Sequence, residues 1–231
     1  MSQQSPTVVI LGASRGIGLG LAREYVRRGW RVIATARSPE GKARLQGLTS
    51  NKQLDIRELD ITDAIQLSAL TSGLSDTQID VLFANAGISR GPYETANTIS
   101  REDFAQLMVT NALSPIAAIK AFRPLMKEDG VIVVMSSNLA SIADVTGGGW
   151  EVYRASKASL NSLLQSYAIR HSDDRRTYLA LSPGWVKTDM GGPDAPLDIE
   201  TSVSGMLSVI DQRRGDGGVA FVDYLNNQIP W

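Results

Sequence analysis

Cysteine is absent from the 231-residue chain, and histidine occurs once, as His171. Without cysteine the chain has no disulfide, thiolate nucleophile, thiolate-bound zinc or iron–sulfur cluster. One histidine cannot supply the several imidazole ligands of a histidine-based metal site, and we predict no metal centre. The chemistry must therefore rely on hydroxyls, lysines, amides, carboxylates or a bound cofactor.

An excess of either charge is also missing, because 23 Lys and Arg stand against 24 Asp and Glu and the net charge is −1. Without a basic surplus, we expect neither nucleic acid nor an anionic membrane as the main partner. No apolar run approaches the ~20 residues that span a bilayer, and the first residues lack the basic and apolar parts of a secretion signal. The expected location is the cytoplasm.

The chain alternates short apolar runs with longer stretches of helical period. Strands are predicted at residues 7–11, 31–36, 54–59, 81–84, 131–135, 178–182 and 218–222. Helices are predicted at residues 17–28, 62–73, 101–126, 153–170 and 199–213. Strands that alternate with helices pair in parallel through right-handed crossovers. We therefore predict a single α/β domain over residues 1–231, a doubly wound (Rossmann-type) parallel sheet of about seven strands with helices on both faces and a short substrate loop at about 188–198.

Residues 12–18, directly after the first predicted strand, read Gly-Ala-Ser-Arg-Gly-Ile-Gly and open a helix. Such glycines permit a tight turn and the close approach of a pyrophosphate, which the helix N-terminus binds through free N–H groups. A plain tight turn is the alternative. Gly12, Ser14 and Gly16 also fit the nucleophile elbow of α/β-hydrolases, which would need His171 as its base. Only eleven residues precede Gly12, too few for the strands that supply an oxyanion loop, so the hydrolase is the weaker hypothesis.

The end of the second predicted strand bears on which dinucleotide is bound. A site that prefers NAD places a carboxylate about 20 residues after the glycines, where it bonds the ribose 2′-hydroxyl. Here the strand is followed by Arg37 and Ser38, with no carboxylate. A guanidinium suits a 2′-phosphate, and Arg15 in the glycine turn could be a second contact. Either arginine could instead be a solvated surface charge. We predict NADP(H).

Tyr153 and Lys157 lie four residues apart on a predicted helix, so their side chains share one face. An ammonium group near a phenol favours the phenolate and brings the phenol pKa toward the working range of an acid–base catalyst. An exposed pair without function is the alternative, because this spacing is common in helices. Ser136 and Ser137 end the fifth predicted strand, where a hydroxyl would point into the same crevice at the carboxyl edge of the sheet.

Six short elements stand along the chain in one order: Gly12-x-x-x-Gly16-x-Gly18, Asn85-Ala86-Gly87, Asn111, Ser136-Ser137, Tyr153-x-x-x-Lys157 and Pro183-Gly184-x-x-x-Thr188. On these elements the chain resembles the short-chain dehydrogenases/reductases from Val8 to about Met190. The segment 184–192 and the ending Ile229-Pro230-Trp231 resemble the compact carbonyl reductases and C-signal-like proteins of that family.

The resemblance implies that Tyr153 protonates a carbonyl oxygen as hydride arrives, or removes a proton in the reverse direction. Lys157 would lower the pKa of Tyr153 and hold the nicotinamide ribose, and Asn111, unless it merely bonds backbone, would anchor a water of the proton relay. A serine would hydrogen-bond the substrate oxygen. In much of the family this serine lies about 13 residues before the tyrosine, within reach of the substrate. Ser137 lies sixteen before it and is preferred, because it ends the strand, whereas Ser141 lies twelve before it and is the competitor.

The resemblance also implies which residues contact the cofactor: Gly12, Ser14, Arg15, Gly16, Ile17, Gly18, Arg37, Asp60, Ile61, Asn85, Ala86, Gly87, Tyr153, Lys157, Pro183, Gly184, Val186 and Thr188. Asp60 would meet the adenine amino group, unless it caps the helix predicted from Thr62. His171 ends a helix, where a cation complements the dipole, and is given no catalytic role.

The sequence therefore predicts an NADPH-dependent reductase that converts a small-molecule aldehyde or ketone to an alcohol. The alternative is a non-catalytic NADP(H)-binding signalling or sensor protein on the same fold, against which the complete catalytic set argues. A homodimer or homotetramer is implied, through the helices at 101–126 and 153–170. Tyr93, Trp150 and Trp185 suggest an apolar or aromatic substrate, although ordinary loop packing explains them equally well.

Overall fold

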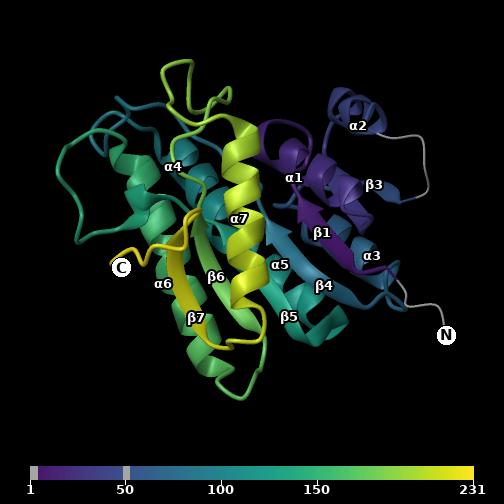
Figure 1. The fold of residues 1–231 in the computed structure, drawn as a ribbon. Coiled ribbons are helices and arrows are strands. Elements are labelled where there is room, and N and C mark those ends of the chain that lie inside the picture. Colours follow the sequence, from purple (N-terminus) through teal and green to yellow (C-terminus); the bar gives the residue numbers. More distant parts are fainter. Residues whose placement is uncertain (1–4, 49–52) are drawn as a thin grey trace.

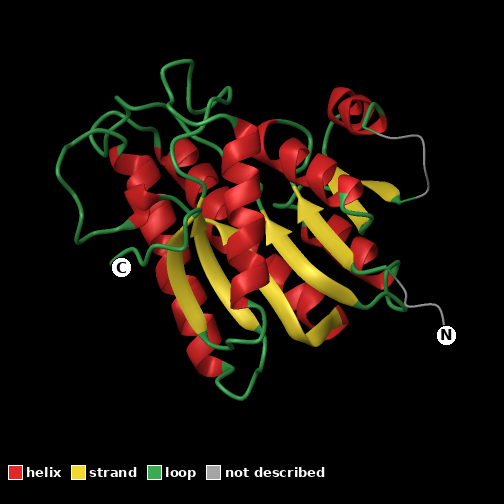
Figure 2. Ribbon diagram, in the orientation of Figure 1, coloured by secondary structure: helices red, strands yellow, loops and turns green. Residues whose placement is uncertain are grey.

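The computed structural model describes residues 5–48 and 53–231 of the chain. Its strands are β1 (Thr7–Leu11), β2 (Arg31–Ala36), β3 (Leu54–Glu58), β4 (Ile79–Ala84), β5 (Met126–Met135), β6 (Thr177–Ser182) and β7 (Val219–Asp223). They form one parallel sheet in the order β3-β2-β1-β4-β5-β6-β7. Helices cover both faces of this sheet, as Figures 1 and 2 show. The doubly wound architecture predicted from the alternating pattern is confirmed.

Two apolar layers hold the helices against the sheet. The helices are α1 (Gly16–Arg27), α2 (Pro39–Gln46), α3 (Ala64–Ser72), α4 (Arg101–Met108), α5 (Ser114–Phe122), α6 (Glu151–Arg170) and α7 (Ile199–Arg213). Ile10 of β1 belongs to the layer that contains Leu21 of α1 and Met206 of α7, whereas the next residue, Leu11, belongs to the layer that contains Leu164 of α6. Burying one such side chain contributes roughly 1.5–3 kcal/mol.

The prediction of one continuous helix over residues 101–126 is wrong. After α4 the chain forms a π-helical turn, η1 (Val109–Leu113), then α5, then a 3₁₀ turn, η2 (Arg123–Leu125), and Met126 already begins β5. Pro124 lacks the N–H group that an α-helix needs to continue, which explains why α5 ends just before it. The apolar spacing runs through both breaks and therefore did not reveal them.

Helix α2 was not predicted at all. Its start is nevertheless encoded, because the Ser38 side chain accepts a hydrogen bond from Gly41 N at 3.2 Å and Pro39 occupies the first helical position. Only Gly41 and Leu45 of this helix are buried, so it lacks the apolar stripe on which the prediction depended.

The order of the strands creates a switch point at the carboxyl edge of the sheet. β1 lies between β2 and β4, so the chain leaves it in one direction for the first crossovers and in the other for the later ones. Ligands of open α/β sheets bind at this position. In the described part of the chain, no helix is both long and apolar enough to cross a membrane.

Candidate active site

The glycine turn after β1 packs tightly against the loop after β4. Gly12 has φ +88° and Gly16 has φ +54°, backbone conformations that side chains rarely allow. A Cβ atom at Gly12 would lie 2.8 Å from Ala86 Cα, and one at Gly18 would lie 2.2 Å from the Gly12 carbonyl oxygen. Asn85 Nδ2 donates to that carbonyl at 2.7 Å. The two loops are therefore packed so closely that only glycine fits at positions 12 and 18.

The N-terminus of α1 is left open by its own side chains. The residue before it, Arg15, makes no capping hydrogen bond. The other helices that follow extended N-cap residues are each capped by a side chain: Ser38, Asp63, Ser100 and Asp198. Unpaired N–H groups and the positive dipole end suit phosphate oxygens. The glycine turn and this uncapped helix therefore fit the pyrophosphate of a dinucleotide.

Two residues expected at the adenosine end of the cofactor, Arg37 and Asp60, follow the carboxyl ends of β2 and β3. Arg37 is exposed after β2, and its guanidinium lies 3.9 Å from an Asp60 carboxylate oxygen. Asp60 accepts hydrogen bonds from the Thr62 N–H and hydroxyl at 2.9 and 2.7 Å, and these bonds lower the pKa of Asp60. The cap of α3 is Asp63, not Asp60, so the capping alternative weighed for Asp60 is wrong.

Helix α2 closes the turn from a side that the sequence did not foresee. A Cβ atom at Gly41 would lie 2.7 Å from Ser14 Cβ, so the helix contacts the glycine turn directly. One turn further along, Arg44 lines a groove of about 560 Å³ together with Arg15 and Thr188. The Ser-Pro start of α2 was the only signal that could have indicated this helix and its arginine.

The loop after β6 returns to the same place. Gly184 has φ +78°, and a Cβ atom there would lie 2.5 Å from Leu197 Cδ1. The Thr188 hydroxyl accepts from Gly191 N at 3.0 Å, and its methyl group lies beside Gly16. Pro183 precedes this turn, and Val186 is buried within it. The structure therefore brings the Pro183-Gly184-x-x-x-Thr188 element onto the glycine turn.

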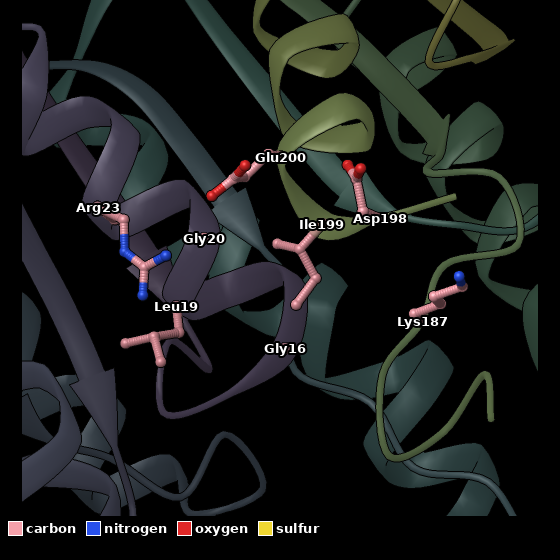
Figure 3. A pocket seen from close by; sticks show the side chains of 8 residues that line it. All are labelled: Gly16, Leu19, Gly20, Arg23, Lys187, Asp198, Ile199 and Glu200. Carbon is pink, nitrogen blue, oxygen red and sulfur yellow. The ribbon is translucent and has the colours of Figure 1, made fainter. Parts of the chain in front are cut away.

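A second groove, of about 320 Å³, lies between α1 and the start of α7. Figure 3 shows Ile199 pointing from α7 toward the glycine turn, with Arg23 and Lys187 on opposite sides of the hollow. Arg15, at the edge of the larger groove, forms an ion pair of 3.2 Å with Asp189. Sequence reasoning missed Arg23 and Lys187 as groove residues because no motif contains them.

Tyr153 and Lys157 lie on the first turns of α6, under the carboxyl end of β5. Lys157 is 3% exposed, and its ammonium group donates to the Met135 carbonyl at 2.7 Å and lies 5.7 Å from the centre of the Tyr153 ring. An exposed pair without structural contacts is therefore excluded. Burial raises the pKa of Tyr153 to about 12 and lowers the pKa of Lys157 to about 8. The expectation that Lys157 brings the pKa of the phenol down toward the working range is therefore wrong for this structure, because burial of the phenol decides the direction.

Asn111 lies in the π-helical turn η1, buried beside this pair. Its Oδ1 accepts from Ile88 N at 2.8 Å, and its Nδ2 donates to Ile88 O at 2.8 Å and to Ser156 Oγ at 3.0 Å. Asn111 thus bonds backbone, as the alternative interpretation expected, and it also bonds a side chain of α6. A Cβ atom at Gly87 would lie 3.4 Å from Asn111 Oδ1 and 3.5 Å from Lys157 Nζ. The Asn-Ala-Gly element, Asn111 and Lys157 are thus neighbours. Ser156, which links them to α6, was missed because its position carries no motif.

The three serines around the end of β5 have different surroundings. Ser136 is buried and donates to Asn161 Oδ1 at 2.7 Å, on the opposite side from Ser137. Ser137 is partly exposed, and its hydroxyl accepts from Leu139 N at 3.1 Å, where it caps the short turn η3 (Asn138–Ala140). Ser141 is 1% exposed and accepts from Asp144 N at 3.2 Å. Of the two candidate serines, Ser137 is the accessible one.

His171 lies at the opposite end of α6 from Tyr153. Eighteen helical steps of 1.5 Å separate the two positions by roughly 27 Å. Its ring stacks on Tyr167 with centroids 4.3 Å apart, and Nδ1 lies 2.8 Å from the Tyr167 carbonyl oxygen. The glycine turn lies at the carboxyl edge of the sheet with Tyr153, so His171 cannot serve Ser14 as a base. The hydrolase hypothesis is therefore wrong.

Comparison with known proteins gives matches over most of the chain. A family model described as enoyl-(acyl carrier protein) reductase matches residues 12–202. An uncharacterized oxidoreductase of Schizosaccharomyces pombe is 31% identical over an alignment of 254 residues that covers 100% of both chains. The C-signal protein of Myxococcus xanthus is 35% identical over 167 residues, which are 71% of this chain and 100% of the relative.

Solved structures give the same assignment. A Burkholderia multivorans protein with bound NADP is 41% identical, with a TM-score of 0.95, over 98% of this chain and 100% of that one. A carbonyl reductase from Pseudomonas aeruginosa in complex with NADP is 38% identical, with a TM-score of 0.90, at the same coverage. These matches confirm the resemblance drawn from the six motifs, and the chain belongs to the short-chain dehydrogenase/reductase family of oxidoreductases.

Proposed function

We propose that the protein is an NADPH-dependent reductase that converts an aldehyde or ketone to an alcohol. The observation that carries this proposal is the convergence at one sheet edge of an open glycine turn and of Tyr153, Lys157 and Asn111. The turn fits a dinucleotide. The Lys157 ammonium lies 5.7 Å from the centre of the Tyr153 ring, and Asn111 is bonded to the same helix through Ser156. The similarity to a carbonyl reductase that was crystallised with NADP supports both the cofactor and the reaction.

The cofactor would rest on the glycine turn, with its pyrophosphate at the uncapped N-terminus of α1. Arg37 and Arg15 would bind the 2′-phosphate through charge-assisted hydrogen bonds. When bound, the nicotinamide supplies the hydride. Asp60 and Ile61 would flank the adenine, and the residues after β6 would border the nicotinamide. In this proposal residues 1–231 are one domain, and the loop at about 188–198 borders the substrate.

Tyr153 would give the proton that completes the alcohol. With a pKa near 12, its phenol stays protonated at neutral pH and is ready to donate to a carbonyl oxygen that gains negative charge. Lys157, charged below pH 8, would stabilise the phenolate that remains after this transfer. Asn111, through Ser156 and the backbone of Ile88, would hold the polar path by which a proton returns to the site.

A serine hydroxyl would hold the substrate oxygen beside the phenol. Ser137 is favoured over Ser141 because Ser137 is partly exposed at the strand end, whereas Ser141 is 1% exposed. The Ser137 oxygen accepts from Leu139 N at 3.1 Å, and its hydrogen donates to Asn138 Oδ1 at 3.3 Å, a long and exposed bond that a substrate oxygen would replace. Donors that point at a developing oxyanion typically contribute 10²–10³-fold in kcat, on the order of 3 kcal/mol.

We also propose a homodimer or homotetramer that pairs along α4, α5 and α6. Apolar side chains are exposed on α4, on the turn η1 that leads into α5, and on α6: Phe104 at 38%, Leu113 at 58% and Leu163 at 39%. Such side chains gather on one surface mainly where another chain covers them.

The proposal is tested by measuring NADPH oxidation against a panel of aldehydes, ketones and quinones. Wild type should turn over at least one of them, and Tyr153→Phe should lose at least about 10²-fold in kcat while its NADPH affinity stays within twofold, because the phenyl ring keeps the packing and lacks the proton. Turnover that survives in Tyr153→Phe would refute the assigned acid. NADPH binding without turnover of any compound would favour the non-catalytic signalling or sensor protein, for which the similarity to C-signal is the supporting observation.

A further inference from the structure

The residue that leads into α6 has an unusual backbone. Trp150 has φ 62° and ψ 25°, in the left-handed region. Within the described residues 5–48 and 53–231, Asn226 is the only other non-glycine residue with positive φ. For a bulky side chain this conformation is a genuine outlier. Strain of this kind persists only where neighbouring contacts enforce it, and it gathers at functional sites.

The other helix starts make the contrast clear. Five helices are preceded by residues with extended backbone: Arg15, Ser38, Asp63, Ser100 and Asp198. The backbone of Trp150 is not extended, and its side chain makes no capping hydrogen bond to α6. A serine or aspartate with extended backbone would be the stable choice at this position. The chain forgoes that stability here, so another contact must depend on the turn.

That contact is with the phenol ring of Tyr153. The indole and phenol centroids are 5.8 Å apart, and the rings meet edge to face at 65°. This geometry is one of the two that aromatic pairs prefer. The backbone N–H of Trp150 donates to the Pro92 carbonyl at 2.9 Å, which connects the loop after β4 to the start of α6. Arg154 donates to the carbonyls of Gly149 and Trp150 at 2.9 and 2.7 Å and fixes the turn from the helix side.

We propose that Trp150 is a positioning residue, which uses its left-handed turn to hold the indole against Tyr153 and so fixes the phenol for proton transfer. This role rests on the proposed reductase function. A misplacement of about 1 Å at a reacting group can lower a rate by about 10²-fold, so a lock on the ring has a measurable consequence. The Tyr153 ring then has two neighbours: the Trp150 indole, and the Lys157 ammonium group, which lies 5.7 Å from the ring centre.

The surroundings of Trp150 determine which substrate the test should use. Tyr93, Ile142 and Val145, on the two loops that Trp150 joins, are exposed by 91%, 73% and 52%. The segment 136–150 contains no lysine or arginine, and the one arginine of the segment 88–99, Arg90, is bonded to Asp103 and Gln106. No cation of these loops is left to receive a carboxylate. A neutral aromatic aldehyde is therefore the appropriate probe.

The experiment compares wild type with Trp150→Phe, Trp150→Ala and Trp150→Gly, measuring kcat and KM for a neutral aromatic aldehyde, Kd for NADPH and the midpoint of urea unfolding. We expect Ala and Gly to lower kcat by about 10-fold or more, with Kd for NADPH within twofold of wild type, and Phe to keep most of kcat. Gly is at ease with positive φ, so Trp150→Gly should unfold at a higher urea concentration than Trp150→Ala yet be no more active.

Each other outcome overturns the role. An active wild type with unchanged kcat in Trp150→Ala would refute positioning while leaving the reductase intact. Activity that follows stability, with Gly recovering what Ala loses, would show that the backbone turn matters and the indole does not. A wild type silent toward every carbonyl compound would refute the reductase, and the positioning role with it.

Discussion

The buried ammonium of Lys157 should make the protein less stable than it would be without it. Lys157 is 3% exposed, and burial lowers its pKa from 10.5 to about 8. At about 1.36 kcal/mol per pKa unit, holding the charge in the folded state costs roughly 3 kcal/mol at neutral pH. Replacing Lys157 with Met keeps the length and burial of the side chain and removes the charge. The substitution also removes the hydrogen bond from Lys157 to the Met135 carbonyl. This loss costs roughly 1–3 kcal/mol at every pH and offsets part of the stability gained by removing the charge.

The pH dependence separates these two contributions. Below pH 8 the lysine is protonated in both states and the full cost is present, whereas above pH 10.5 it is neutral in both states and the cost has vanished. Wild-type stability relative to Lys157→Met should therefore rise by about 3 kcal/mol between pH 7 and pH 11, mostly between 8 and 10.5.

Urea unfolding of both proteins across this range measures the difference, in which all other titrations cancel. Lys120→Met is the matched control, because it makes the same substitution at an exposed position on α5. A flat difference for Lys157→Met would refute the buried charge. In the same preparations Lys157→Met should be inactive, which would make the lysine a residue kept for function at a cost in stability.

Three further outcomes follow from the site and the packing. Arg37→Ala should raise Kd for NADPH about 10–100-fold and leave Kd for NADH unchanged, since a lost charged hydrogen bond is worth about 1.5–3 kcal/mol; equal losses by calorimetry would exclude the 2′-phosphate contact. Asp174→Asn should destabilise the fold by about 3 kcal/mol, because the carboxylate is 1% exposed and pairs with Arg176 at 2.8 Å; urea unfolding within 1 kcal/mol of wild type would contradict this. Leu113→Glu, at a side chain that is 58% exposed, should yield monomers in sedimentation; an unchanged mass would place the interface elsewhere.

The features that could be predicted from the sequence are those set by local pattern. Buried parallel strands read as continuous apolar runs, so the sheet was predicted nearly strand for strand. The glycine turn was recognisable because its constraint is local, as Gly18 shows: a Cβ atom there would lie 2.2 Å from the Gly12 carbonyl oxygen. The pairing of Tyr153 and Lys157 follows from helical spacing alone.

The features that could not be predicted depend on distant contacts. Helix α2 is polar and is held by the approach of Gly41 to Ser14, which no spacing reveals. The π-helical turn at Asn111 exists where its side chain bonds Ile88, 23 residues away in the chain. The left-handed turn at Trp150 is enforced by the Pro92 carbonyl, and nothing local favours it. Each of these lies at the candidate site, where tertiary contacts override local preference.

The transfer of a labelled hydride tests the central claim most directly. NADPH carrying deuterium at the reactive carbon of its nicotinamide would be incubated with wild type and a carbonyl compound that it turns over, and the alcohol would be analysed by mass spectrometry and NMR. The account predicts an alcohol with deuterium on the carbinol carbon and a hydroxyl proton drawn from solvent. Tyr153→Phe should not form this alcohol. Alcohol without label on carbon, or equal labelling with Tyr153→Phe, would contradict it.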